Sequence, residues 1–353
     1  MNESGQLPHF TDALHAAGAG PLHGQRVLRL WAQGLPLDAG KRRMESYFPQ
    51  SLRAALPSLG DQFDALATLH SAHPAADGSE RLLVRLADGQ MVESVLLPRG
   101  GLCISSQIGC AVGCVFCMTG RDGLLRQLGS AEMVAQVALA RRRRAVKKVV
   151  FMGMGEPSHN LDNVLDAIEF LGSTGGIGHK NLVFSTVGDP RAFERLPLGK
   201  VKPALALSLH TTDPALRRKL LPRAPRMDPE ALVEAADAYA RGCGYPVQYQ
   251  WALLEGINDT DEEVEALSRL LAGRYGVLNL IPFNAAEGLD FQRPSHARAE
   301  AMARQLHARG ILTKLRQSAG QDVDGGCGQL RARALQPDTP AAGRPAIPIA
   351  VQA

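Results

Sequence analysis

Three cysteines, Cys110, Cys114 and Cys117, lie together with the spacing C-x3-C-x2-C and are the residues best suited to carry chemistry. Cysteine thiolates are the usual ligands of iron–sulfur clusters, and a cube of four irons normally takes four of them. Three thiolates on one short loop would therefore leave one iron open for a small chelating ligand. Gly109 and Gly113 would let the backbone curl around such a cluster, because glycine has no Cβ.

The alternatives are a zinc knuckle and incidental buried cysteines. Zinc normally takes four nitrogen or sulfur ligands, and in the neighbouring sequence only Cys103 could complete a set. We favour the iron–sulfur cluster because the spacing, with Phe116 before the last cysteine, resembles the signature of radical SAM enzymes. That resemblance implies a [4Fe–4S] cluster and S-adenosylmethionine (SAM) as cofactors.

Polar residues follow the next predicted strands. A glycine-rich turn, Met152–Pro157, would allow a ligand to approach the backbone, and its glutamate could bind the ammonium of SAM. Taken alone, the glycine-rich turn is explained by a tight turn. Each of the polar residues that follow the later strands is explained as a strand end or a helix cap, without a ligand. Their serial placement at strand ends favours one shared ligand site. The predicted SAM-binding residues here are Gly155, Glu156, Ser185, Ser208, Leu209 and His210.

Short apolar runs alternate with amphipathic stretches from about residue 100 onward, and these elements would position the candidate residues. Such strand–helix units predict an α/β fold with a parallel sheet, open or closed into a partial barrel, with its chemistry at the carboxyl ends of the strands. The predicted strands are Leu102–Ile108, Val149–Met154, Leu182–Thr186, Ala204–Leu209, Val247–Leu254, Val277–Pro282 and Ile311–Leu315. The predicted helices include Ser130–Arg143, Leu161–Leu171, Pro229–Tyr239, Asp261–Leu271 and Ala297–Arg309, with Ser130 as an N-cap and Glu132 in the first turn.

Four regions are expected along the chain. Residues 1–80 form a small, mostly helical accessory domain that could bind RNA, and 81–98 form a β-hairpin around the Asp88-Gly89 turn. Residues 99–332 form the catalytic core. Residues 333–353 are expected to be a disordered tail, since the stretch from Gln336 holds four prolines and many alanines.

Four segments together resemble the RlmN/Cfr family of radical-SAM RNA adenine methyltransferases, which methylate a ring carbon of adenine. The resemblance runs from about residue 80 to 330 and rests on Val92–Val95, Leu102–Cys110, Gly153–Pro157 and Asp322–Leu330. It implies a partial (βα)6 radical-SAM barrel. A cysteine seven residues before the cluster loop plus a late Cys-Gly-Gln-Leu is more specific than the cluster motif alone.

The resemblance also implies a mechanism with two further cysteines and two SAM molecules per turnover. One SAM methylates Cys327, and reductive cleavage of a second removes a hydrogen atom from that S-methyl group, which then adds to the adenine carbon. Cys103 next attacks the sulfur of Cys327, forming a transient disulfide and releasing the product. Glu93 matches the position of the proton acceptor and Asn284 that of a SAM contact. Without the resemblance, Cys103 and Cys327 would be buried thiols, Glu93 an exposed strand residue and Asn284 a loop residue.

Two basic segments are candidates for contact with RNA phosphates. The run Arg141–Arg144, with Lys147 and Lys148, is better interpreted as a solvated face that complements the helix dipole. A second patch consists of Arg217–Lys219 and Arg223. The net charge of +4 is compatible with RNA and equally with many other enzymes.

The predicted function is methylation of a ring carbon of adenine, carbon 2 in preference to carbon 8, in ribosomal or transfer RNA, with a flavodoxin- or ferredoxin-like electron donor. Departures from the family pattern at Met118, Leu124–Leu128 and Gln250 leave the RNA target open. The alternatives are another radical-SAM enzyme with a non-RNA substrate and a non-catalytic iron–sulfur RNA-binding protein. No apolar run approaches the roughly 20 residues that a membrane helix needs, and no secretory signal is evident. We therefore expect a cytoplasmic protein with reduced thiols and no membrane partner.

Overall fold

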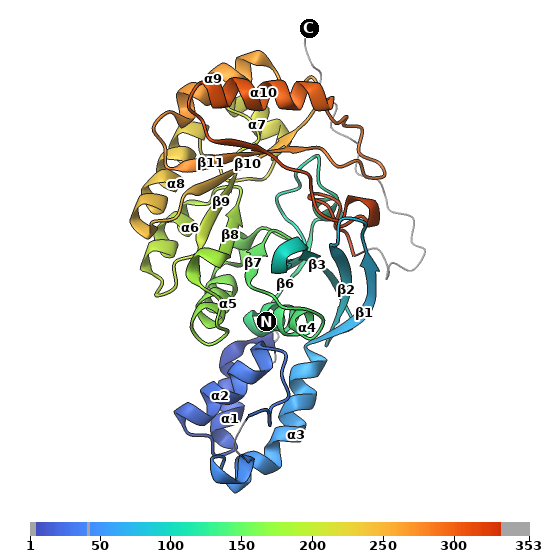
Figure 1. Ribbon diagram of the computed structural model, residues 1–353, viewed down its shortest axis with the longest axis vertical. Helices are drawn as coiled ribbons and strands as arrows, with labels where there is room; N and C mark the ends of the chain where they lie inside the picture. The colour runs from blue at the N-terminus through green and yellow to red at the C-terminus, as the bar shows by residue number, and fades with distance from the viewer. Residues whose placement is uncertain (1–4, 41–42, 333–353) are drawn as a thin grey trace.

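A ten-stranded sheet runs through the larger part of the molecule, and a group of helices forms a separate layer at one end (Figure 1). The computed structural model describes residues 5–40 and 43–332 of the 353-residue chain. The predicted tail, residues 333–353, lies outside the described residues. In the part of the chain that is described, no helix is long and apolar enough to cross a membrane.

The sheet has an antiparallel part and a parallel part. Its first four strands pair antiparallel, and from the fourth strand onward every neighbour is parallel. In spatial order the strands are β1 (Ala67–Pro74), β2 (Glu80–Leu86), β3 (Met91–Leu97), β4 (Gly101–Cys103), β7 (Lys148–Phe151), β8 (Leu182–Thr186), β9 (Ala204–Ser208), β10 (Val247–Leu253), β11 (Gly276–Pro282) and β12 (Thr313–Leu315). The predicted hairpin is confirmed as β2 and β3.

The parallel strands are joined by helices that cover the sheet. Strands such as β8 are buried along their whole length, which is typical of parallel strands covered on both faces. The connecting helices are α4 (Ser130–Arg141), α5 (Leu161–Ser173), α6 (Pro190–Arg195), α7 (Pro214–Leu220), α8 (Pro229–Cys243), α9 (Asp261–Leu271) and α10 (His296–Ala308). The predicted α/β architecture of repeated strand–helix units is therefore confirmed.

The predicted strand Leu102–Ile108 is two strands in two different sheets. After β4 the chain leaves the main sheet, and β5 (Gln107–Gly109) pairs antiparallel with β6 (Leu124–Gln127). Ser105 lies at this change of direction, where its hydroxyl donates to the carbonyl of Glu93 (2.6 Å) and accepts from the amide of Met154 (2.9 Å). The bend turns the cluster loop toward the carboxyl ends of the parallel strands.

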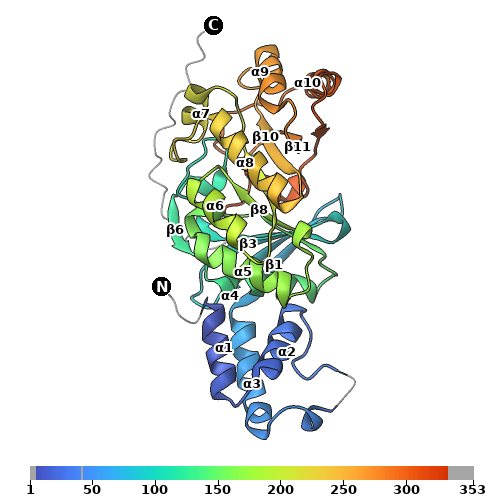
Figure 2. The ribbon, with the colours of Figure 1, turned by 90° about the vertical axis from the view of Figure 1, so that its left-hand side faces the viewer.

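The N-terminal helices α1 (Leu7–Ala16), α2 (Pro21–Ala32) and α3 (Gln50–Ala65) pack around an aromatic cluster that is continuous with the main hydrophobic core. Trp31 stacks on Phe63 with ring centroids 4.5 Å apart, and Phe10 packs against both rings. This helical group lies beneath α4 (Figure 2). The amide of Leu7 donates to the hydroxyl of Ser130 (3.0 Å), so Ser130 links the two parts; the N-cap of α4 is its neighbour Gly129.

The basic run Arg141–Arg144 is a junction between these parts of the fold. Each guanidinium has a partner from a different element, rather than forming a free solvated face. Arg141 donates to the carbonyls of Ala32 and Gly175, Arg142 pairs with Asp64, Arg143 pairs with Glu80, and Arg144 donates to the carbonyls of Gly78 and Leu96. The run therefore ties α3 and the β2–β3 hairpin to the end of α4.

Candidate active site

A cavity of about 170 Å³ lies where the carboxyl ends of the parallel strands meet the loop that follows β5. Most of the residues proposed from the sequence line this cavity. They are Cys110, Cys114, Cys117, Gly155, Glu156, Ser185, Ser208, His210, Asn284 and Cys327. Three do not line it: Leu209, Cys103 and Glu93 are buried outside the cavity lining.

The three thiols of the cluster loop share an apolar wall with Phe116, Val187 and other core residues. Burial raises the pKa of Cys110 to about 12, and burial together with the neighbouring cysteines raises the pKa of Cys114. The pKa of Cys117 is raised by burial, although Thr119 and nearby amides oppose it. A bound metal would therefore have to displace protons from all three thiols, as metals do at thiolate sites.

Glycines at the base of the cluster loop hold its shape. Gly109 and Gly113 have φ of +75° and +65°, in the left-handed region that favours glycine. A Cβ on Gly109 would lie 2.0 Å from the carbonyl oxygen of Gly123, where the amide of Cys110 donates (2.9 Å). The loop is thus folded back on itself independently of any ligand.

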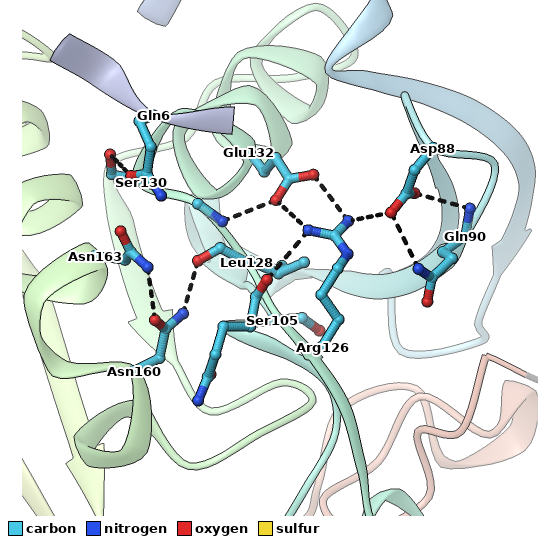
Figure 3. Close-up of polar contacts among 12 residues, drawn as sticks. Gln6, Asp88, Gln90, Ser105, Arg126, Leu128, Ser130, Glu132, Asn160 and Asn163 are labelled. Atoms are coloured by element: carbon cyan, nitrogen blue, oxygen red, sulfur yellow. Dashed lines mark hydrogen bonds and ion pairs between the residues drawn. The ribbon is translucent and has the colours of Figure 1, made fainter. Parts of the chain in front are cut away.

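The far end of the loop is anchored by Arg126 on β6 (Figure 3). Its guanidinium forms two hydrogen bonds of 2.9 Å with Glu132 and an ion pair of 2.9 Å with Asp88. Glu132 also accepts from the amide of Gly129 (2.8 Å), which confirms its place in the first turn of α4. Arg126 therefore fixes β6 between α4 and the turn of the hairpin.

The residues around the cavity fit a thiolate-bound cluster better than a single ion. Within the described residues, no three His, Cys, Asp or Glu groups converge closely enough to hold one metal ion. Cys110, Cys114 and Cys117 all line the cavity, and soft thiolates are the donors that iron–sulfur clusters take. Gly155, which also lines the cavity, has a φ of +105°, and a Cβ there would lie 2.6 Å from the side chain of Gln107, so only glycine fits this position.

Glu156 is held rigidly at the end of β7. One carboxylate oxygen accepts from the amide (3.1 Å) and hydroxyl (2.7 Å) of Ser158, and the other accepts from the amide of Val187 (3.0 Å). A carboxylate has about four lone-pair sites, so these three bonds leave one for a ligand such as an ammonium. Gln107 orients the backbone here, because its Oε1 accepts from the amide of Glu156 (2.7 Å).

His210 is a neutral ring in a constrained backbone. Its φ of +64° is unusual for a residue other than glycine, and the amide of Ala252 donates to its Nδ1 (3.0 Å). Burial, with the nearby Arg217 charge, lowers the pKa of His210 to about 3. The ring therefore carries its single proton on Nε2. It packs edge-to-face against Phe116 of the cluster loop, with the two ring centroids 4.9 Å apart.

Arg217 is part of the wall behind the site and not part of a surface patch. It is buried, and its guanidinium donates to the carbonyls of Val187, Ser208 (3.0 Å) and Leu209 (2.5 Å). Burial lowers its pKa to about 10, while Cys114 and Glu156 oppose this shift. It joins the ends of β8 and β9, and this role was not foreseen from the sequence.

The loop that carries Cys327 is held against both sides of the cavity. On the cluster side, Met118 donates to the carbonyl of Gly328 (2.7 Å) and Thr119 to that of Leu330 (2.7 Å). On the β11 side, Asn284 Nδ2 donates to the carbonyl of Cys327 (2.9 Å) and to Ser318 Oγ (2.8 Å).

A further residue of this loop, Gln329, links the Cys327 loop to the segment that follows β11. It accepts from the amide of Gly326 (2.9 Å) and donates to the carbonyl of Ala285 (3.0 Å). Gln329 belongs to the late Cys-Gly-Gln-Leu motif, but the sequence gave no indication of these two contacts.

Cys103 and Cys327 differ sharply in their surroundings. Cys327 is exposed, whereas Cys103 is buried at the end of β4. Burial and the charge of Cys327 raise the pKa of Cys103 to about 12, although a backbone hydrogen bond from Met152 opposes the shift. The structure contains no disulfide bond, because all six cysteines are free.

Glu93 is buried, contrary to the exposed strand residue that the sequence alternative assumed. Its Oε1 accepts from the Arg81 guanidinium, and its Oε2 accepts from the amides of Arg331 (2.7 Å) and Ala332 (2.9 Å). The side chain of Arg331 pairs in turn with Asp122 near the cluster loop (3.0 Å). In this arrangement Glu93 holds the segment that follows Cys327.

The fold and this site define a radical SAM protein. The family model of the radical SAM superfamily matches residues 104–271, which include the cluster loop and strands β7 to β10. The sheet with its helices is the α/β partial barrel of that class, preceded by the N-terminal helices. The class implies a [4Fe–4S] cluster and SAM, for which Cys110, Cys114 and Cys117 are the available ligands.

Full-length relatives narrow the class. The chain is 70% identical over 332 residues to a "Probable RNA methyltransferase" of Leptothrix cholodnii, covering 94% of this chain and 96% of the relative. It is 68% identical over 340 residues to a protein of the same name from Thiobacillus denitrificans, covering 96% and 94%. A solved radical SAM methyltransferase from Sphaerobacter thermophilus superposes with a TM-score of 0.81 at 34% identity, covering 93% of this chain and 98% of that one. The chain belongs to the radical SAM methyltransferase family.

Proposed function

We propose that this protein methylates a ring carbon of adenine in RNA, carbon 2 in preference to carbon 8, by way of a methyl group carried on Cys327. One observation carries the proposal: Cys327 lines the same cavity as Cys110, Cys114 and Cys117, on a loop that is hydrogen-bonded to the cluster loop. RNA as substrate is supported by the names of the relatives and by the resemblance to the RlmN/Cfr family. Ribosomal and transfer RNA are both candidate substrates.

The adenine ring carbons are poor nucleophiles, so they need a reaction other than direct transfer from SAM. Bound at Cys110, Cys114 and Cys117, the cluster with SAM would supply the methyl group and the removal of a hydrogen atom, drawing electrons from a flavodoxin- or ferredoxin-like donor. The chain supplies the carrier: the exposed sulfur of Cys327 can accept a methyl group and present it to a base at the mouth of the cavity.

Cys103 is the proposed resolving thiol. Its raised pKa keeps it protonated at neutral pH, so it does not compete with Cys327 for the first methyl group. After the ring carbon has lost its proton, attack of Cys103 on the sulfur of Cys327 would form a transient disulfide and break the bond from that sulfur to the methylene carbon. The released carbon takes up a proton and becomes the methyl group of the product. Cys327 lies close enough to Cys103 for its charge to raise the pKa of that thiol, which supports pairing of the two residues.

The remaining residues are proposed to position the cofactor and the loop of Cys327. Glu156, Ser185, Ser208 and His210 line the cavity together with Gly155, and we propose that they bind SAM. Asn284 contacts the Cys327 loop and lines the same cavity, so it can position cofactor and carrier together. For Glu93, which the resemblance makes the proton acceptor, we propose a positioning role, because two of its three side-chain hydrogen bonds hold the segment that follows Cys327. The third joins it to Arg81 on β2.

The experiment is Cys327→Ala with Cys243→Ala as the matched control, since Cys243 lies at the end of α8 away from the cavity. Both variants should assemble the cluster and cleave SAM on reduction. Only Cys327→Ala should lose transfer of labelled methyl groups to RNA isolated from cells that lack the gene. Chromatography of digested RNA against 2-methyladenosine and 8-methyladenosine identifies the carbon.

Three results would contradict the proposal. Methyl transfer by Cys327→Ala at the wild-type rate would show that Cys327 does not carry the methyl group. SAM cleavage without any modified adenine in RNA would favour a radical SAM enzyme with another substrate. A reconstituted protein that does not cleave SAM would favour a non-catalytic iron–sulfur protein.

A further inference from the structure

A dense group of positive charges follows the end of β9, on the face of the barrel where the site opens. Helix α7 and the loop after it carry Arg218, Lys219, Arg223 and Arg226, and no acidic residue occurs between Pro214 and Met227. The segment connects the carboxyl end of β9 to the start of α8. It therefore lies on the same side of the sheet as the cavity.

These four cations are exposed and unneutralised. Within residues 5–40 and 43–332, none of their side chains forms a hydrogen bond or an ion pair. Arg217, beside them, is different: it is buried and donates to three backbone carbonyls. Four like charges within nine residues repel one another, and nothing in the described fold compensates for that repulsion.

The run Arg141–Arg144 provides an internal comparison. It is equally dense in sequence, yet each of its guanidinium groups is bound to a carboxylate or a backbone carbonyl. Those arginines do structural work between α3, the hairpin and α4. Arg141–Arg144 therefore have their charges engaged within the fold, whereas the four cations at α7 are available for a partner.

The α7 segment is joined directly to the cluster loop. The amide of Val115 donates to the carbonyl of Leu220 (3.1 Å), and the amide of Arg223 donates to the carbonyl of Val112 (3.2 Å). The Arg223 guanidinium lies so close to Gly113 that a Cβ there would be 2.4 Å from its Nη2. The exposed charges are thus one loop away from Cys114 and the cavity.

We propose that Arg218, Lys219, Arg223 and Arg226 form a binding surface for the phosphate backbone of the RNA on either side of the target adenine. The proposal rests on the proposed function and adds the surface that positions the substrate. A base must leave its stack to enter a cavity of this kind, and phosphates flanking an extruded base remain close to the rim. Charges at the rim can hold those phosphates without reading the sequence.

The test measures RNA binding as a function of salt. The triple variant R218Q/K219Q/R226Q leaves Arg223 in place, because its guanidinium contacts the cluster loop. Each phosphate contact contributes about 0.7–0.9 to the slope of log K against log salt. Between about 50 and 200 mM salt, the variant should bind labelled bulk transfer RNA or labelled ribosomal RNA fragments with a slope reduced by about 2 to 3.

Two matched variants control for charge and for position. R218K/K219R/R226K keeps the charges and should keep the wild-type slope, since counterion release depends on charge. Lys180→Gln removes an exposed, unpaired cation of the described fold that precedes β8. It lies at the amino ends of the strands, away from the cavity, so this change should leave binding unchanged. Cluster content and SAM cleavage without RNA should be the same in all variants.

The outcomes separate this inference from the proposed function. A triple variant that retains the wild-type slope, in a protein that still methylates RNA, overturns the binding surface alone. A wild-type protein that neither binds nor methylates either RNA overturns both. A triple variant that has lost SAM cleavage without RNA would show that the segment supports the cofactor site, which also contradicts the inference.

Discussion

Replacing Glu93 with glutamine should release the segment that follows Cys327. The carboxylate accepts three hydrogen bonds, one from the Arg81 guanidinium and two from backbone amides. An amide has only one acceptor oxygen, so its NH₂ group would face either Arg81 or the backbone donors. Breaking a buried ion pair costs about 3–5 kcal/mol, and because Arg81 is 17% exposed we expect about 3 kcal/mol here.

The assay is hydrogen exchange at the amides of Arg331 and Ala332, which donate to this carboxylate. Because 1.4 kcal/mol corresponds to a factor of ten, a loss of about 3 kcal/mol should accelerate their exchange roughly 100-fold. The control is Glu80→Gln on the neighbouring strand, which removes the partner of Arg143 and should leave these amides protected.

Protection of both amides within a few-fold of wild type in Glu93→Gln would refute this reasoning. It would mean that the carbonyl contacts of Thr119 and Met118 suffice to hold the loop. Loss of methyl transfer with unchanged exchange would instead support a role for Glu93 as proton acceptor.

Alkylation with iodoacetamide at pH 8 should label Cys327 and spare Cys103, because Cys103 is buried and its pKa is raised to about 12; peptide mapping would contradict this by finding both labelled equally. Burial lowers the pKa of His210 from 6.5 to about 3. Between these two pH values the ring binds a proton only in the unfolded chain, so acidification should destabilise the protein. The free energy of unfolding should fall by up to about 1.4 kcal/mol per pH unit below pH 6, and His210→Gln, compared at equal cluster content, should lack this slope. Gly109→Ala places a Cβ 2.0 Å from the carbonyl oxygen of Gly123 at a φ of +75°, so iron content after reconstitution should drop several-fold, and wild-type iron content would refute the strain.

The parallel strands were predictable because burial on both faces makes each one a continuous apolar run. β8 has the predicted bounds, and β9 to β11 differ from them by one residue. β1 was not predicted, since Ala67–Pro74 contains two histidines and buries little, and its pairing with β2 provides what its composition does not. β6 was also missed: this strand has only four residues, and because Leu124 and Leu125 are exposed it lacks the buried apolar run that marks the parallel strands.

The candidate site was predictable where its residues are neighbours in sequence. The cluster loop and the turn at Glu156 are local patterns with a chemical meaning. Leu209 follows β9 between two residues that line the cavity, Ser208 and His210, but its own side chain is buried in the core. Burial of one residue of such a run is set by the folded chain and cannot be read from its place after a strand. The partners of Glu93 lie 238 and 239 positions away, and no spacing rule connects residues that only the folded chain brings together.

The attachment of the Cys327 loop has a consequence for biosynthesis. Its anchors come from β3, from the cluster loop and from the end of β11, and the residues they hold extend to Ala332. During translation the three cluster cysteines leave the ribosome more than 200 residues before the segment that covers them. Throughout that interval the loop of the three cysteines lacks the hydrogen bonds that Gly328 and Leu330 accept, so the candidate site is complete only after the chain has been made as far as Ala332.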